Sequence, residues 1–173
     1  MTSREINNVK FFLDWFNKKN KTDYTIDDSF NEENSHVDVM AKSKTTRKIL
    51  NIQNTAYRSG NIYKYGTSNI PNIMPKIVLG VSMDTKQKKE SIIKCINSKE
   101  TGYAESVVKD LILIIEVTIP SLKPKEIKKM FKGGYKSNFK GIYFVSLPVM
   151  LANIEDEYQK NGYVYSLKEC AEF

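Results

Sequence analysis

The spacing of hydrophobic positions changes along the chain, and each spacing predicts an element. Residues 3–18 repeat apolar side chains at helical intervals, and Thr2-Ser3-Arg4-Glu5 has the spacing of a capping box at their start. Residues 36–41 alternate apolar and polar positions as a strand does, and residues 48–55 form a second such run. The polar segment between the two runs is short enough for an antiparallel hairpin. A helix followed by a hairpin is therefore expected in the first third of the chain.

The remaining pattern predicts an α/β protein. Residues 56–75 are rich in Tyr, Asn and Gly and predict a long loop, a kind of segment that is often functional. Strands are expected at 76–81, 111–115 and 141–147, and helices at 84–102 and 124–131. The run 111–115 is uniformly apolar, which is typical of a central strand covered on both faces. The fold class expected is α/β, with a mixed central β-sheet flanked by helices.

The chain has 173 residues, without an internal repeat or low-complexity linker, and we expect one domain over 1–173. Its core would occupy 3–147, and 148–173 would be a C-terminal extension packed on that core. The longest apolar run is broken by Glu116 and Thr118, and the first residues lack the apolar core of a signal peptide. We therefore expect a cytoplasmic protein with no membrane partner. Two cysteines and one histidine exclude a disulfide scaffold and a Cys/His zinc site, so a metal would need oxygen ligands.

The net charge of +7 is unevenly distributed. Residues 22–41 contain six acidic residues and no Lys or Arg, whereas residues 121–140 contain seven lysines and one glutamate, a net charge of +6. A localised basic surface suits a polyanionic partner such as nucleic acid. The alternative is a solvated, lysine-rich helix and loop without a partner.

Polar residues gather on one face of the predicted hairpin. Strand alternation places Asn51, Gln53 and Thr55 on the same face, and it places Asp38 on the opposite side of its strand from Val37 and Val39. If the register brings Asp38 to that face, its carboxylate joins an amide and a hydroxyl, a set of oxygens that suits Mg²⁺. A bound metal could polarise a phosphodiester and activate water. The alternative is a surface acid near a turn, beside a solvated sheet face.

The order of these segments resembles the PD-(D/E)XK nuclease-like, or restriction endonuclease-like, superfamily. The resemblance covers residues 3–147 and rests on three segments: Val37-Asp38-Val39, then Leu50-Asn51-Ile52-Gln53-Asn54-Thr55, and the later helix and strands. That later part includes Lys99, Tyr103 and the runs 110–115 and 139–145. In that family an Asp on one strand precedes an acid-x-Lys motif on the next, and metal-dependent cleavage of DNA is the usual activity. The resemblance therefore implies a restriction endonuclease-like core and a nuclease that uses Mg²⁺ or Mn²⁺.

The functional residues of the family are only partly present in this sequence. Asp38 matches the Asp of the family, Gln53 stands where the acid is expected, and Thr55 stands where the lysine is expected. Gln53 still offers an oxygen to a metal, but Thr55 cannot supply the cation that offsets phosphate charge. Lys99 or Lys64 could replace the missing lysine. Glu5 could replace the lost carboxylate, so the expected metal ligands are Asp38, Gln53 and Glu5.

Further residues complete the expected nucleic-acid site. His36 shares a face with Asp38 and could act as a general acid or base, although a lone histidine is more often structural. Tyrosines of the long loop could stack on bases; these are Tyr57, Tyr63 and Tyr65. Phosphate contacts are expected from Lys128, Lys129, Lys132, Lys136 and Arg47.

Three functions remain open at this point. The first is a metal-dependent nuclease that acts on nucleic acid, with DNA favoured over RNA. The second is a degenerate nuclease-like fold that binds without cutting. The third is an interaction or assembly protein, because residues 150–173 carry a net charge of −3 and could pair with the basic segment of a second copy in a homodimer.

Overall fold

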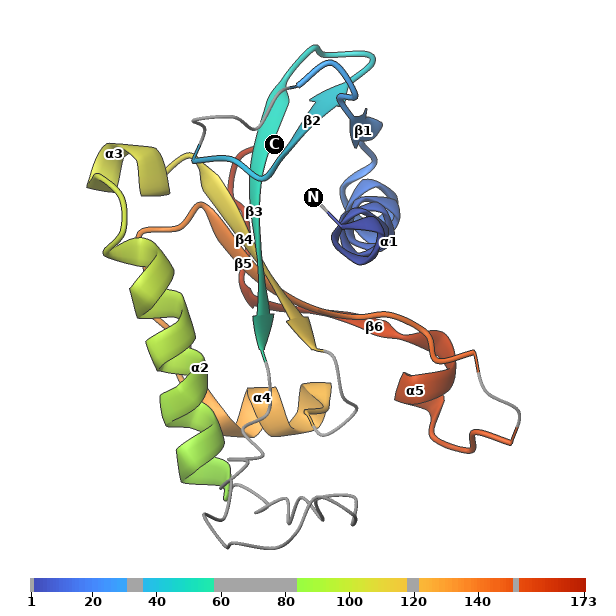
Figure 1. The fold of residues 1–173 in the computed structure, drawn as a ribbon, viewed down its shortest axis with the longest axis vertical. Helices are drawn as coiled ribbons and strands as arrows, with labels where there is room; N and C mark the ends of the chain where they lie inside the picture. Colours follow the sequence, from blue (N-terminus) through green and yellow to red (C-terminus); the bar gives the residue numbers. More distant parts are fainter. Residues whose placement is uncertain (1, 31–35, 58–83, 118–121, 151–152) are drawn as a thin grey trace, which may run out of the picture.

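Six strands form one mixed, open sheet whose strand order follows the chain, β1-β2-β3-β4-β5-β6 (Figure 1). The computed structural model describes residues 2–30, 36–57, 84–117, 122–150 and 153–173. The strands are β1 (Tyr24–Ile26), β2 (Val39–Ser43), β3 (Ile49–Tyr57), β4 (Leu111–Val117), β5 (Gly141–Ser146) and β6 (Tyr163–Lys168). Strands β3, β4 and β5 are parallel to one another, and the other neighbours pair antiparallel. The α/β class and the mixed sheet are thus as predicted.

Helices cover both faces of this sheet (Figure 1). Helix α1 (Ser3–Asn20) packs on one face, here called the α1 face, through Phe12 and Phe16, which contact Tyr143 of β5. Helices α2 (Thr85–Glu100), α3 (Glu105–Val108) and α4 (Pro124–Met130) pack on the other, the α2 face. The predicted central strand, β4, is buried along its whole length because it is covered on both sides.

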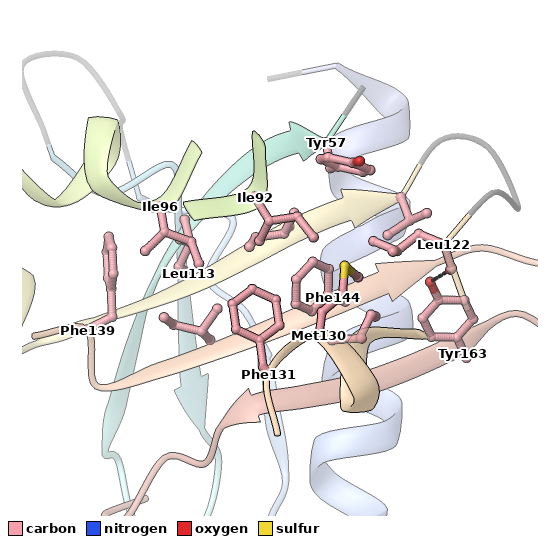
Figure 2. Packing of buried hydrophobic residues seen from close by; sticks show 14 of the residues in the cluster. Tyr57, Ile92, Ile96, Leu113, Leu122, Met130, Phe131, Phe139, Phe144 and Tyr163 are labelled. Carbon is pink, nitrogen blue, oxygen red and sulfur yellow. Dashed lines mark hydrogen bonds between the residues drawn. The ribbon is translucent and has the colours of Figure 1, made fainter. Parts of the chain in front are cut away.

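The α2 face holds the larger apolar cluster (Figure 2). Ile92 and Ile96 of α2 lie over Leu113 of β4, and aromatic side chains fill the space toward α4. The hydroxyl of Tyr163 donates to the backbone oxygen of Leu122, which ties β6 to the chain that leads into α4. The sequence predicted the α2 helix well, since Asp84 caps it and Gln87 completes a capping box.

The structure differs from the sequence-based expectations in four places. Strand β2 begins at Val39 and not at His36, and Val37 packs against the α2-face cluster while Val39 packs against the α1-face cluster, so the predicted alternation fails at Val37. Strand β1 lies within the acidic residues 22–41, where no strand was expected before residue 36. The C-terminal extension supplies α5 (Glu157–Asn161) and β6, which is an edge strand of the sheet itself. The prediction of a loop over 56–75 is partly wrong, because its first two residues continue β3. Residues 58–83 lie outside the described residues, and with them Lys64, Tyr63, Tyr65 and the predicted strand 76–81.

Candidate nucleic-acid interface and hairpin site

The carboxylate of Asp38 ends the β2–β3 ladder. Asp38 directly precedes Val39, which pairs with Ile52, and its backbone N–H donates to the Ile52 oxygen at 3.0 Å. The next donor on β3, the Asn54 N–H, points to Asp38 Oδ2 at 2.7 Å. In a regular antiparallel ladder a backbone carbonyl would accept this N–H; here the Asp38 side-chain oxygen accepts it instead. This hydrogen bond gives Asp38 a role in the fold that is independent of any chemistry.

Gln53 lies on the α2 face and is only 2 % exposed. Its Nε2 donates to the Tyr103 hydroxyl at 2.7 Å and lies 3.5 Å from the backbone oxygen of His36. Its Oε1 has no hydrogen-bond partner among the described residues. A buried amide oxygen without a donor is costly, by roughly 1–3 kcal/mol, and is available to a ligand.

Helix α2 runs past β3 in the opposite direction and brings Lys99 toward the hairpin. Thr55 Oγ1 lies 3.8 Å from Cys95 Sγ, near the middle of α2, whereas Gln53 contacts Tyr103 beyond the end of α2. Lys99 lies between Cys95 and Tyr103, about 6 Å along the helix axis from Cys95, and is half-buried. Along the chain, Lys99 therefore lies between the residues that contact Thr55 and Gln53, Cys95 and Tyr103.

The structure also places His36 here, but not Glu5. The His36 ring lies 4.8 Å from the Tyr103 ring, centroid to centroid. Glu5 belongs to the first turn of α1, on the opposite face of the sheet, where its Oε2 accepts from the Thr2 N–H at 2.6 Å. That hydrogen bond from the Thr2 backbone lowers the pKa of Glu5. The Glu5 side chain thus caps α1 and does not contact Gln53.

The hairpin site is poor in charge. In the part of the chain that the structure describes, no three His, Cys, Asp or Glu side chains are grouped so that they could hold a metal. A cation at the hairpin would depend on Asp38 and on the amide oxygen of Gln53. These are ligands of the right hardness for Mg²⁺, yet only one of them carries charge.

Exposed lysines of α2 and α4 form a second feature, which we call the basic ridge. Its members are Lys86, Lys89, Lys125, Lys128, Lys129 and Lys132. The two helices are joined by an ion pair of 3.3 Å between Lys88 Nζ and Glu126 Oε1, and Lys89 Nζ lies 5.6 Å from the centre of the Phe131 ring. Within the described segments, the four lysines from Lys125 to Lys132 form no ion pair. Their charge is therefore available to a polyanion.

Two predicted phosphate contacts lie elsewhere. Arg47 is in the turn between β2 and β3, beside Asp27 and Asp28, at the end of the sheet away from α4 (Figure 1). Lys136 follows the ridge along the chain and lies near the end of α2, because its neighbours Tyr135 and Ser137 bond to Asn97 and Glu100. The ridge thus includes Lys128, Lys129 and Lys132 but not Arg47.

The acidic C-terminal segment already contacts the basic segment of the same chain. Lys123 Nζ pairs with Asp156, and this contact raises the pKa of Lys123 and lowers that of Asp156. Lys168 Nζ donates to the backbone oxygens of Ser137 and Phe139, the first at 2.7 Å. These contacts position β6 and leave the ridge lysines exposed.

Three polar residues without a role expected from the sequence are buried on the α1 face: Asn8, Asn54 and Glu116. A signal was present, because Asn8 lies among the apolar positions of α1 and Glu116 interrupts the most apolar run.

Comparisons with known proteins add no assignment: no family model matches the chain, and neither a curated protein nor a solved structure matches it. Among the described residues, no helix is long and apolar enough to cross a membrane.

Proposed function

We propose that the protein binds nucleic acid through the basic ridge of α2 and α4. The observation that carries this proposal is the grouping of exposed lysines on two packed helices, without ion pairs for Lys125 to Lys132 within the described segments. Lysines placed in this way neutralise phosphates and release counterions, and they do so without reading base sequence. DNA is the partner favoured by the resemblance described above.

The proposal includes a restriction endonuclease-like core. Its support is the order of elements, in which α1 precedes the β2–β3 hairpin and α2 leads to β4 and then β5 in the same sheet. Asp38 and Gln53 lie side by side where the resemblance expects an Asp and an acid. Fold alone does not decide function, so the proposed activity rests on the ridge and not on the sheet.

The residue types and the burial of the hairpin site favour binding of nucleic acid over its cleavage. Gln53 replaces an acid and is nearly fully buried, Thr55 replaces a lysine, and an oxygen of Asp38 accepts a backbone N–H. Each of these features weakens the charge and the access that a hydrolytic metal site needs.

A specific observation nevertheless supports metal-dependent cleavage as a second candidate function. Lys99 lies between the contacts of Thr55 and Gln53, where a migrated lysine could offset phosphate charge. The unpartnered Gln53 Oε1 and the Asp38 carboxylate would then hold Mg²⁺ or Mn²⁺. Such a metal would supply an activated water and polarise the scissile phosphate.

The assembly function is the least supported of the three. That function depends on ion pairs between the acidic C-terminal segment of one copy and the basic segment of another. Asp156, however, already pairs with Lys123 of its own chain. A homodimer remains compatible with nucleic-acid binding and would be detected as a larger size of the free protein in size-exclusion chromatography.

The test is the salt dependence of duplex DNA binding, followed by fluorescence anisotropy of a labelled oligonucleotide. The double variant Lys128→Glu/Lys129→Glu removes two ridge charges and adds two of the opposite sign. We expect affinity at low salt to fall by about tenfold or more, and the slope of log affinity against log salt to become shallower by about two.

The matched control is Lys10→Glu/Lys18→Glu, which makes the same change of charge on exposed positions of α1. Because α1 lies on the opposite side of the sheet, the control should reduce affinity much less. Equal losses in the two double variants would reject the ridge as the interface. Absence of any salt-dependent binding by the wild-type protein, with a concentration-dependent size, would favour the assembly function instead.

A further inference from the structure

Three polar side chains are buried between α1 and the sheet, on the face opposite the hairpin site. Asn8 of α1 has an exposed fraction of 0 %, Glu116 of β4 one of 5 %, and Asn54 of β3 one of 8 %. Burial of this degree is uncommon for Asn and Glu unless they are hydrogen-bonded.

The hydrogen-bonding capacity of this cluster is not met within the described residues. Both amide atoms of Asn8, Nδ2 and Oδ1, lack a partner, and so does Asn54 Oδ1. Arg4 Nε pairs with Glu116 Oε1 and meets the charge of that carboxylate, although the alignment is not that of a hydrogen bond. Each amide atom left unsatisfied costs roughly 1–3 kcal/mol.

Contacts on either side of Asn8 show where its side chain lies. One turn earlier on α1, Arg4 pairs with Glu116, and one turn later the Phe12 ring packs at a tilt against Tyr143, 4.8 Å between ring centres. Tyr143 pairs with Ile114 in the sheet, and Ile114 pairs with Asn54 on its other side. Asn8 therefore lies over the end of β4 between Glu116 and Ile114, with Asn54 on the adjacent strand.

The unmet atoms are mainly acceptors. Three oxygens, two from amides and one from a carboxylate, lack a hydrogen-bond donor, whereas Asn8 Nδ2 is the one donor of the cluster that lacks an acceptor. A cation coordinated by the three oxygens would satisfy all of them together. Amide and carboxylate oxygens are the ligands that hard divalent cations prefer.

We propose that Asn8, Asn54 and Glu116 form a divalent-cation site under α1, at the carboxyl ends of β3 and β4. Arg4 stands at its rim, since 58 % of its side chain is exposed, and can turn toward solvent when a cation takes its place beside Glu116. The site does not depend on the proposed function, because α1 and the basic ridge lie on opposite faces of the sheet.

The experiment measures cation binding by the whole chain. Terbium is the probe, because Trp15 and Tyr143 lie 5.8 Å apart, ring centre to ring centre, on the same face of the sheet and can sensitise its emission. Competition with Ca²⁺, Mg²⁺ and Mn²⁺ and the rise in Tm on adding each cation give the affinity. Three variants are compared with the wild type: Asn8→Leu, Asn8→Asp and Glu116→Gln.

We expect Asn8→Leu and Glu116→Gln to weaken binding by about tenfold or more, and Asn8→Asp to strengthen it. In the presence of a chelator Asn8→Leu should unfold at a higher Tm than the wild type, because leucine of similar volume removes two unsatisfied polar atoms. The control is Asn7→Leu, which makes the same change at an exposed position of α1 and should leave this binding unchanged.

Three outcomes would overturn the proposal. Binding that is kept in both Asn8→Leu and Glu116→Gln would place the cation outside this cluster. A wild-type protein whose Tm and emission do not respond to cations would leave only buried water for the cluster. A lower Tm of Asn8→Leu in chelator would mean that the Asn8 amide is already satisfied.

Discussion

At the scale of single residues, Asp38 and Gln53 show how a side chain can serve the fold at a position where chemistry was expected. Asp38 completes a strand ladder through Asn54 N–H, and Gln53 is held by the Tyr103 hydroxyl. Substitution of either residue would therefore change stability as well as any activity. A variant that tests cleavage should avoid both residues.

Lys99 provides that test. If the chain hydrolyses phosphodiesters, Lys99→Met should lower the rate of Mg²⁺- or Mn²⁺-dependent DNA cleavage by about a hundredfold, because the developing charge on phosphate loses its cation. Cleavage of labelled single-stranded and duplex DNA is measured, with folding checked by circular dichroism.

The matched control is Lys94→Met, an exposed lysine earlier on the same helix that should keep the wild-type rate. An unchanged rate in Lys99→Met would rule out Lys99 as the replacement for the missing lysine of the motif. A wild-type protein that binds DNA but never cuts it would leave binding as the whole function.

At the scale of elements, the start of α1 is set by a capping box. The Glu5 N–H donates to Thr2 Oγ1 at 3.3 Å, and Glu5 Oε2 accepts from the Thr2 N–H at 2.6 Å. The same helix carries Arg4 and Asn8, so the cap also positions the cluster on the α1 face. A local motif thus helps to place residues that lie far apart in the chain.

The cap makes part of the stability dependent on pH. The folded-state pKa of Glu5 is lowered, chiefly by the Thr2 backbone hydrogen bond, so its contribution is present above the unfolded pKa and is lost as pH falls through the folded pKa. Relative to Glu5→Gln, the wild type should be more stable by about 0.5 kcal/mol near neutral pH, and this difference should vanish at about pH 3.

Urea unfolding at the two pH values measures this difference. Glu90→Gln on α2 is the control, since Glu90 is exposed and its only ion pair in the described segments spans 4.0 Å. A Glu5→Gln difference that persists in acid would show that the charge of Glu5 does not stabilise the cap.

At the scale of the whole molecule, the last residues close the α1 face. The Cys170 N–H donates to the Tyr143 hydroxyl at 2.8 Å, and the Phe173 ring packs edge-on against Phe16 at 5.6 Å between ring centres. Cys170 is buried, and that burial raises the pKa of its thiol. The thiol therefore reports on whether this part of the chain is in place.

Tyr143→Phe should release Cys170. The substitution leaves a buried N–H without an acceptor, so we expect a loss of roughly 1–2 kcal/mol in the free energy of unfolding and faster alkylation of Cys170 by iodoacetamide. The rates at Cys170 and Cys95 are followed by mass spectrometry, with Cys95 as the internal reference.

Tyr163→Phe is the matched variant, because it removes another buried hydroxyl, on the α2 face. It should cost comparable stability while the rate at Cys170 relative to Cys95 stays at the wild-type value. If both variants raise that relative rate equally, global unfolding and not the Tyr143 contact controls access to the thiol.

Local patterns in the sequence determined much of the fold. The helical spacing of α1 and α2, the capping box of α1 and the alternation along β3 were readable because each depends on residues a few positions apart. The face shared by Gln53 and Thr55 was predicted for the same reason, and both residues do contact the α2 side.

Only the tertiary structure decided the rest. Strand β1 has three residues and exists by pairing with β2, and β6 joins the sheet through β5, so neither strand left a clear periodic signal. Glu5 was expected beside Gln53, but the face that α1 covers is set by packing and not by helical spacing. The burial of Asn8, Asn54 and Glu116 on one face depends on contacts between distant segments, which no local pattern specifies.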